Sequence, residues 1–566
     1  QKKKAFKNSC GYTLPDDPET FGGYFDSGST WTTNSLTETR NDDYNVTSQA
    51  IANYMGTFGS HNLTVMAGFE NYYMKSESLG AARDKYELTG YPYLNIGSED
   101  FQTNSGTGSE YTSNSVFGRV IYSYADRYLF QANVRHDGSS RFAKGYRWGT
   151  FPSFSAGWVA SEEKFMKNLK WDWLSFLKLR GSWGMLGNER IGSNYFPYIA
   201  LMSFGNSLFY MADGSVVSDK TARPAVLAVE DITWETTTST DLGLDVNFLN
   251  NRLQFHFDYY WKETKDMLLN IEIPYFMGYN NPSTNAGKMS THGYDIEVAW
   301  NDQIGDFKYG VNVNFSDFLS KIDYMNDGEQ ISGGKIKRAG VLFNEFYGYV
   351  CEGIYQTQEE VNNSARTSTT VTVGDLKYRD ISGPDGVPDG VISPEYDRVP
   401  LGNSLPRFQY GGSLNASYKG IDFSLAFQGI GKQNSYLSTS MVQPLRDNYG
   451  NVPAILEGKY WSPFNTTEEN LAAKYPRLSN VSKSNNYATS NFWMFNGSYF
   501  RLKNITLGYT LPKSWTQKAG INRARFYVSG SDLFCLSNFP SGWDPEMGTS
   551  DYPITTSLVM GIQVNF

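Results

Sequence analysis

The chain has 566 residues, of which 16% are aromatic, while its mean hydropathy is only −0.47. No run of about eighteen apolar residues occurs, which excludes a transmembrane helix. A net charge of −9 without a basic block excludes a nucleic-acid-binding surface of the usual basic kind. A high aromatic content at low mean hydropathy is instead typical of a membrane β-barrel, in which alternate residues of each strand contact lipid and the others contact water.

The first residues, QKKKAFKNSC, are basic but are followed by neither an apolar segment nor a small-residue cleavage site. They are therefore not a signal peptide. A protein of an outer membrane must be exported, so we expect either a removed signal or a longer polypeptide of which this chain is the later part. We favour the longer polypeptide.

Further along the chain, amphipathic segments recur in pairs joined by very short connections. The pairs are 45–58 with 61–74, 116–124 with 127–135, 241–248 with 252–261, 293–300 with 307–317, and 404–418 with 421–429. Long insertions, 186–231, 320–403 and 431–497, separate the pairs. Short turns at one end and long loops at the other are typical of outer-membrane barrels. We count about fifteen such strands, or sixteen if residues 30–40 form one.

The last strand, over 556–566, is the clearest. Leu558, Met560, Ile562, Val564 and Phe566 alternate with a face of small and polar residues. This period of two predicts a strand, and its length of about ten residues is enough to cross a bilayer at a tilt. The last strand of a soluble sandwich would show the same alternation, but the terminal aromatic favours a membrane strand. We therefore predict an all-β fold, a transmembrane antiparallel β-barrel.

Seven segments carry a resemblance to a known family. They are RVIYSYADRYLFQANVRHDGSSRF (119–142), WGTFPSFSAGWVASEEKFM (148–166), FLKLRGSWGMLGNERIG (176–192), WETTTSTDLGLDVNFLNNRLQFHFDYYWKETKDML (234–268), YNNPSTNAGKMSTHGYDIEVAW (279–300), LPRFQYGGSLNASYKGIDFSLAFQG (405–429) and SYFRLKNITLGYTLP (498–512). In this order they resemble the barrel of SusC/RagA-type TonB-linked outer-membrane proteins. Phe566 likewise resembles the terminal insertion signal that the barrel assembly machinery reads in such proteins.

The resemblance implies a barrel of about twenty-two strands filled by a plug. It also implies import of oligosaccharides or peptides across the bacterial outer membrane. Its expected partners are a SusD-like surface lipoprotein, TonB, the barrel assembly machinery, the substrate and outer-membrane lipid. No plug or TonB box is recognisable in the sequence, so residues 1–566 are expected to be the C-terminal portion of the barrel.

An acidic stretch, GDLKYRDISGPDGVPDGVISPEYDR (374–398), lies in the longest insertion. It brings together Asp375, Asp380, Ser382, Asp385, Asp389, Glu395 and Asp397. Hard cations prefer six to eight oxygen ligands, so calcium at Asp380, Ser382, Asp385 and Asp389 is one hypothesis. The stretch lacks the closing Glu of a calcium loop, so a solvated acidic turn without an ion is the alternative.

Other residues offer weaker signals. The four histidines, His61, His136, His256 and His292, have no Cys or Glu at ligand spacing, and no nucleophile elbow or phosphate loop occurs, so we expect no enzyme. Luminal groups such as His256, Asp258, Asp295 and Glu297 could line a substrate path or simply face water. Loop aromatic residues, namely Tyr347, Tyr349, Trp461 and Trp493, could stack on sugar rings, pack within the loops or contact a lipoprotein.

Three functions therefore stand as hypotheses: a TonB-dependent importer with a lipoprotein lid, a self-contained passive porin of sixteen strands, and an outer-membrane barrel enzyme. The loop lengths favour the importer, because insertions this long are commonly functional.

Overall fold

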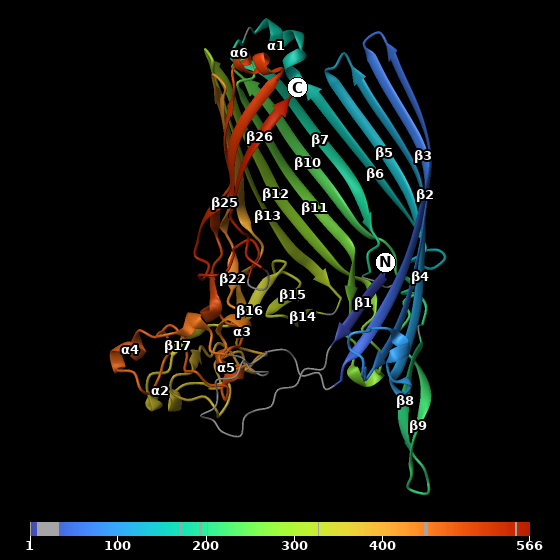
Figure 1. The fold of residues 1–566 in the computed structure, drawn as a ribbon, viewed down its shortest axis with the longest axis vertical. Helices are drawn as coiled ribbons and strands as arrows, with labels where there is room; N and C mark the ends of the chain where they lie inside the picture. The colour runs from blue at the N-terminus through green and yellow to red at the C-terminus, as the bar shows by residue number, and fades with distance from the viewer. Residues whose placement is uncertain are drawn as a thin grey trace.

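The computed structural model describes residues 2–7, 33–169, 171–191, 195–200, 202–326, 328–446, 451–548 and 552–566. Its main element is a single antiparallel sheet of 16 strands, in which strands that follow one another along the chain lie side by side (Figure 1). The small sheets and helices occur in the connections between these strands. The predicted all-β architecture is therefore confirmed.

The strands of the main sheet have the following bounds, in spatial order: β1 (Lys2–Lys7), β2 (Ser35–Phe58), β3 (His61–Asp84), β4 (Gln102–Tyr124), β5 (Tyr128–Ser139), β6 (Trp148–Val159), β7 (Leu174–Asn188), β10 (Glu235–Phe248), β11 (Leu253–Asn270), β12 (Ser283–Ile304), β13 (Phe307–Met325), β20 (Arg407–Tyr418), β21 (Ile421–Lys432), β24 (Tyr499–Thr510), β25 (Arg523–Ser537) and β26 (Ser557–Asn565). Each predicted hairpin is present with its predicted turn. Many strands are longer than predicted, because they continue beyond the segment in which apolar and polar residues alternate.

The tight turns are made by residues that tolerate a left-handed backbone. In the β10–β11 turn, Asn250 and Asn251 have φ angles of 58° and 64°. Asparagine adopts this conformation more readily than most residues, which explains why the Asn-Asn pair predicted the turn. In the β20–β21 turn, Gly420 has a φ of 90° next to Lys419.

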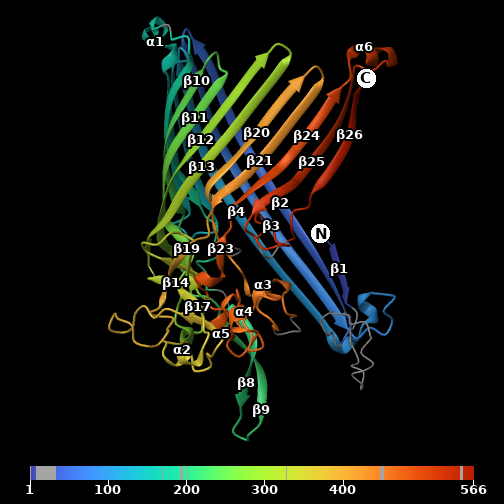
Figure 2. The same cartoon turned by 90° about the vertical axis from the view of Figure 1, so that its left-hand side faces the viewer.

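The two ends of the sheet differ, and we call them the short-turn end and the long-loop end. The short-turn end carries the hairpin turns, the helices α1 (Lys164–Asn168) and α6 (Lys513–Thr516), and the end of β26 (Figure 1). The long-loop end carries the small sheets and the remaining α-helices (Figure 2). No described helix is long and apolar enough to cross a membrane.

The elements of the long-loop end are of three kinds. One is a protruding hairpin of β8 (Met202–Tyr210) and β9 (Val216–Pro224). Another is a set of small sheets made of β14 (Glu329–Ser332), β15 (Lys335–Arg338), β16 (Glu345–Tyr349) and β19 (Arg398–Asn403), of β17 (Cys351–Ile354) with β18 (Leu376–Tyr378), and of β22 (Asn434–Tyr436) with β23 (Met494–Asn496). The third is a set of short helices, namely α2 (Gln358–Asn362), α3 (Thr439–Val442), α4 (Thr467–Leu471) and α5 (Lys483–Asn486).

The strand proposed over residues 30–40 is not a separate element. Residues 30–32 lie outside the described part of the chain, and residues 35–40 form the start of β2. The additional strand is β1, which pairs with that start, Lys4 lying opposite Glu38. The sequence analysis missed β1 because its run of lysines shows no alternation of apolar and polar residues.

The register separates the side chains into two faces. Residues directly opposite one another in neighbouring strands point to the same side of a sheet. One row crosses eight strands as Lys178, Asp245, His256, Glu297, Asn314, Gly411, Gln428 and Arg501. The adjacent row is Leu179, Leu244, Phe257, Ile296, Phe315, Tyr410, Gly429 and Phe500. We call these the inner face and the outer face.

The outer face exposes apolar side chains to its surroundings. Leu242, Leu507 and Ile562 are 54%, 56% and 64% exposed, respectively. Exposure on this scale along most of the strands is unfavourable in water, and it is the normal state of a barrel wall in lipid. The outer face is therefore the membrane-contacting surface that the alternation predicted.

This assignment predicts a face-specific response to charge. Val313→Arg places a charge on the outer face of β13, where desolvation by lipid is expected to cost about 2–4 kcal/mol. Asn312→Arg is the matched control, because its side chain points to the inner face beside Glu297. The urea midpoint of each variant in phospholipid bilayers, followed by tryptophan fluorescence, measures the difference. Equal midpoints for the two variants would contradict the assignment of the faces.

Candidate functional site

The inner face carries a cluster of ionisable side chains on β3 to β12, which we call the charged sector. Its members are Glu70, Arg119, Arg135, Asp137, Lys178, Arg180, Asp241, Asp245, His256, Asp258, Asp295 and Glu297. The register brings them onto one wall although they span more than 220 residues of sequence. The luminal groups named from the sequence, His256, Asp258, Asp295 and Glu297, all belong to this sector.

Arg180 is the centre of the densest part of the charged sector. Its guanidinium lies 2.5 Å from Asp258 and 3.2 Å from Asp245. The carboxylate of Asp245 also lies 3.6 Å from Lys178 Nζ and 3.0 Å from His256 Nδ1. One carboxylate thus joins side chains of β7 and β11 across β10. Partly exposed ion pairs contribute little stability individually, so the main effect of this network is to fix the positions of the side chains on the wall.

Arg135 organises a second group of contacts on β3, β4 and β5. It lies 2.7 Å from Asp137 and 3.2 Å from Glu70, and it donates a hydrogen bond of 2.7 Å to Ser115 Oγ. Its guanidinium also lies 5.3 Å from the ring centre of Phe117. The planar guanidinium can satisfy all these partners at once, which a lysine could not.

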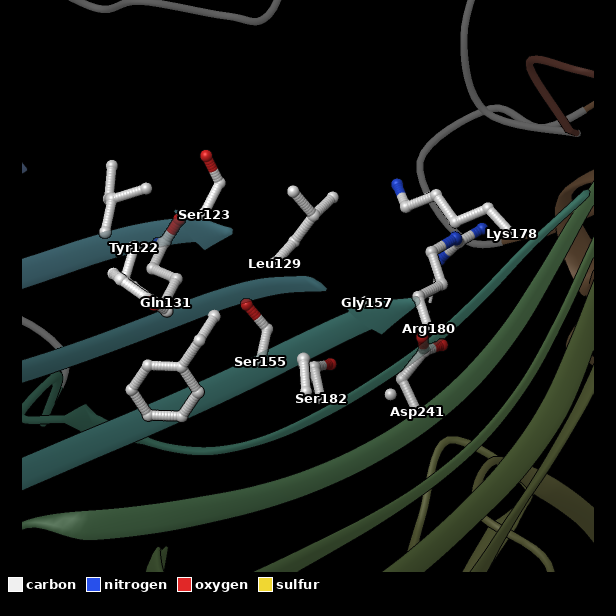
Figure 3. A pocket seen from close by; sticks show the side chains of 14 residues that line it. Tyr122, Ser123, Leu129, Gln131, Ser155, Gly157, Lys178, Arg180, Ser182 and Asp241 are labelled. Carbon is white, nitrogen blue, oxygen red and sulfur yellow. Dashed lines mark ion pairs between the residues drawn. The ribbon is translucent and has the colours of Figure 1, made fainter. Parts of the chain in front are cut away.

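A hollow of about 380 Å³ opens on the inner face next to Arg180. Figure 3 shows Lys178 and Arg180 together on one side of it, with Ser123, Leu129 and Gln131 across from them. Two cations, the carboxylate of Asp241, hydroxyl groups and an aliphatic side chain therefore line one concave surface. This composition is suited to holding a polar ligand or another polypeptide segment rather than to catalysis.

Two of the long loops fold together into one subdomain, which we call the loop subdomain. It consists of the β13–β20 connection and the β21–β24 connection. Its core is formed by Tyr349, Leu376, Tyr378 and Ile392 from the first and by Met441, Val442, Leu456 and Trp493 from the second. Loops with a shared apolar core hold a defined shape, whereas loops without one remain mobile.

A buried ion pair joins the two connections. The side chain of Asp375 is fully buried and lies 2.7 Å from Arg477 Nε. It also accepts hydrogen bonds from Ser482 Oγ at 2.8 Å and from Asn486 Nδ2 at 2.8 Å. A buried carboxylate is tolerated only when its oxygens are satisfied in this way. Asp375 is therefore a structural residue and not a member of an ion-binding loop.

A group of ion pairs around Arg501, which we call the Arg501 clasp, attaches the β25–β26 connection to the inner face. Arg501, whose side chain is 3% exposed, lies 2.6 Å from Asp544 and 2.6 Å from Glu546. Lys503 lies 2.8 Å from Asp532 and 3.4 Å from Glu546. Burial raises the pKa of Asp544, but the hydrogen bond and charge of Arg501 together with the backbone N–H groups of Glu546 and Met547 outweigh it and hold that pKa below its ordinary value. The connection is thus fixed against the wall by charge.

Three carboxylates of the acidic stretch accept hydrogen bonds from the backbone of the same loop. Asp380 accepts a hydrogen bond from the backbone of Gly390, and Asp389 accepts one from the backbone of Val391. Asp397, which is fully buried, accepts bonds from the backbone of Ile381, Ser382 and Ser393. Among the described residues, no group of three or more His, Cys, Asp or Glu side chains could hold a metal ion. Calcium at Asp380, Ser382, Asp385 and Asp389 stays a prediction.

The four aromatic residues named for sugar stacking are buried. Tyr347, Tyr349, Trp461 and Trp493 are 7%, 8%, 8% and 1% exposed. Their rings pack inside the loops, as Trp493 does between Tyr475 and Tyr487, and so offer no free face to a ligand. Of the alternatives considered, packing within the loops describes them.

The remaining candidates are dispersed. His61 and His136 contact Tyr122 and Thr150, respectively, and share no ligand-binding geometry. Phe566, 85% exposed, follows the last residue of β26 at the short-turn end, and its role as an insertion signal stays a prediction.

Sequence reasoning missed the roles of Asp375, Arg477 and Arg501. A usable signal existed for Asp375, because it stands between the apolar residues Val373 and Leu376, where a charge is expected mainly if it is buried with a partner. No signal in the sequence identifies Arg477 as that partner, since 102 residues separate the two.

Residues 4–529 match the family model described as "TonB dependent receptor-like, beta-barrel". The chain is 30% identical over 560 residues to TonB-dependent receptor P3 of Formosa agariphila, an alignment that covers 92% of this chain and 52% of that protein. It is 28% identical over 538 residues to TonB-dependent receptor SusC of Bacteroides thetaiotaomicron, covering 92% and 50%. The chain thus spans about half the length of the curated relatives it matches.

Solved structures show the same fold. The structure of the RagAB peptide transporter superimposes with a TM-score of 0.80 at 23% identity, covering all of this chain and 58% of that one. The RagAB peptide importer in its open-open state gives a TM-score of 0.79 with 57% of its chain covered.

Breaking the buried ion pair tests the loop subdomain. Asp375→Asn leaves Arg477 without its carboxylate, and loss of one partner of a buried pair typically costs about 3–5 kcal/mol. We expect limited proteolysis to cleave residues 350–490 much faster while the strands stay protected. Glu359→Gln, at an exposed position of α2, is the control and should be cleaved at the wild-type rate. Unchanged cleavage of the Asp375 variant would contradict the central role of this pair.

The thiol of Cys351 provides a pH-dependent readout of the same subdomain. Burial raises its pKa to about 11. At neutral pH it therefore holds about a hundredfold less thiolate than an ordinary thiol of pKa 9. Maleimide labelling followed by mass spectrometry should be slow at pH 7.5 and rise about tenfold per pH unit up to pH 10. Urea-unfolded protein is the control, and equal rates in the two states would contradict the burial.

Proposed function

Because the chain belongs to the TonB-dependent receptor β-barrel family, we propose that it is the C-terminal portion of the barrel of a TonB-dependent importer for large nutrients. The family consists of outer-membrane receptors and transporters, so the chain is an outer-membrane protein and not an enzyme. Membership of this family confirms the outer-membrane location and the non-enzymatic function that were predicted from the sequence.

The observation that carries the import proposal is the loop subdomain above the inner face. A passive pore for small solutes needs no folded structure of this size over its mouth. Two connections that share a core, together with a third held by the Arg501 clasp, build a rigid surface at the entrance of the barrel. Such a surface is suited to retaining a ligand before it passes inward.

We propose that the imported ligand is an oligosaccharide or a peptide. One solved relative is described as a peptide importer, and one curated relative is named SusC. The proposed partners are a SusD-like surface lipoprotein above the loop subdomain and TonB, which acts through a part of the polypeptide outside this chain. The plug is proposed to belong to that same part, consistent with the half-length match to the relatives.

The dependence of uptake on energy tests this function. An affinity tag inserted at the exposed β8–β9 turn, residues 212–215, leaves Phe566 unaltered and allows native purification. We expect a polypeptide about twice this length, together with a surface lipoprotein. Uptake of labelled malto-oligosaccharides or of a tryptic casein digest by intact cells should stop when a protonophore collapses the proton-motive force.

Two outcomes would contradict the importer. Uptake that continues after the proton-motive force collapses, with steady ion conductance in planar bilayers, would indicate a passive porin. Recovery of this chain without any longer polypeptide would remove the basis for coupling to TonB. Disruption of the tonB gene is the control for indirect effects of the protonophore.

A further inference from the structure

The inner face changes character between β12 and β13. On β13, β20 and β21, all of whose residues are described, charged side chains on this face lie only at the strand ends, as Lys308, Arg407, Asp422 and Lys432. Between those ends lies a group of amide and hydroxyl side chains, which we call the neutral shelf. It consists of Asn312, Asn314, Ser316, Gln409, Ser413 and Gln428.

The register assembles the neutral shelf from three strands. Asn312 lies opposite Ser413, and Ser316 lies opposite Gln409. Together with Gly411 these residues line a hollow of about 630 Å³. Gly411 keeps the centre of the hollow open, because a Cβ at this position would come within 3.2 Å of Asn314 Oδ1.

Several side chains of the shelf have unused hydrogen-bonding capacity. Within the described part of the chain, the side chains of Asn314, Ser316, Gln409 and Ser413 make no hydrogen bond to the protein. Elsewhere on the inner face such groups bond to one another, as Thr506 does with Ser529 at 2.8 Å. The shelf therefore offers donors and acceptors that no described residue occupies.

The edges of the shelf are held in place. Asn312 donates a hydrogen bond of 2.7 Å to Glu297, and Gln428 donates one of 2.8 Å to Glu546 of the β25–β26 connection. The free amides thus project from a wall whose borders are fixed. Preorganised groups of this kind bind with less loss of conformational entropy than mobile ones.

The shelf differs from the charged sector in the ligand that it suits. In the charged sector, cations and carboxylates already pair with one another, whereas the shelf has no cation between its ends. An anionic ligand would meet Glu297 at the border without any countercharge, whereas uncharged hydroxyl or amide groups find matching partners. We propose that the neutral shelf binds the uncharged hydrogen-bonding part of the imported ligand, either sugar hydroxyl groups or peptide backbone amides.

The position of the shelf fits this role, which rests on the import function proposed above. Ser316 lies nine residues before the end of β13 at the long-loop end, and Gln409 lies two residues after the start of β20. Ser316 is thus the middle residue of β13, and Ser413 lies five residues before the short-turn end of β20, so the shelf extends from the middle of the strands toward the loop subdomain. A ligand released from the loops would reach it before the short-turn end.

Binding to the complete polypeptide in its native complex tests the shelf. The probes are neutral malto-oligosaccharides, alginate-derived uronate oligosaccharides and a tryptic casein digest. We expect the double variant Asn314→Leu with Gln409→Leu to bind malto-oligosaccharides or casein peptides at least about tenfold more weakly than wild type. The probe that loses affinity identifies the sugar or the peptide as the source of the contact. Asn415→Leu, on the same face toward the short-turn end, is the control and should bind as wild type does.

Chemical accessibility gives a second, independent readout. In protein whose three native cysteines are replaced by serine, Ser413→Cys should react with a membrane-impermeant maleimide added to intact cells. The bound neutral probe should protect it. Absence of labelling without any probe would mean that another part of the polypeptide covers the shelf, which would overturn the proposal.

The outcomes separate this inference from the proposed function. If wild-type cells take up none of the probes, the import function fails. If they take up a probe that the double variant binds as tightly as wild type does, the shelf proposal alone fails. If only the uronate probe binds and the double variant weakens it, the neutral character of the shelf is wrong. The urea midpoint of each variant verifies that the barrel is folded.

Discussion

The structure depends on the continuous backbone pairing of one antiparallel sheet. In lipid an unpaired amide or carbonyl has no water to bond with, so each strand must align with its neighbours over its full membrane segment. The alignment has a chemical consequence, because a shift of one residue would reverse every side chain of a strand. The row from Lys178 to Arg501 stays polar through eight strands only because the register is correct at each pairing.

The inner wall is divided into sections that differ in the charge of their side chains. In the section from β3 to β12, charged side chains form ion pairs with one another, such as Arg180 with Asp258, and these pairs fix the positions of the side chains on the wall. On β13, β20 and β21, the side-chain amides of Asn314 and Gln409 make no hydrogen bond to another described residue, and they are the groups of the proposed ligand contact. The outer face shows no such division, since lipid selects only for apolar character. A transporter can thus vary the inner residues of a strand without altering the surface that anchors it.

Sequence reasoning identified what depends on local pattern and missed what depends on distant partners. Alternation and turn residues such as Asn250 and Asn251 located the hairpins, because a strand and its turn are encoded within a few residues. For the acidic stretch the sequence left a calcium site and a solvated turn as alternatives, and it does not show that Asp375 turns inward to Arg477 while Asp397 binds its own loop backbone. The burial of Tyr349 and Trp493 could not be predicted either, because the sequence around an aromatic residue in a long loop is the same whether its side chain is buried or exposed.

The Asp375–Arg477 pair also constrains the order in which the protein assembles. Its two partners lie in separate connections, and the hairpin of β20 and β21 stands between them along the chain. Until that hairpin and β24 have joined the sheet, nothing holds the two connections, and hence the carboxylate and the guanidinium, close together. We therefore expect the loop subdomain to close late in biogenesis. A protease-resistant loop subdomain would then report that this part of the barrel has been inserted correctly.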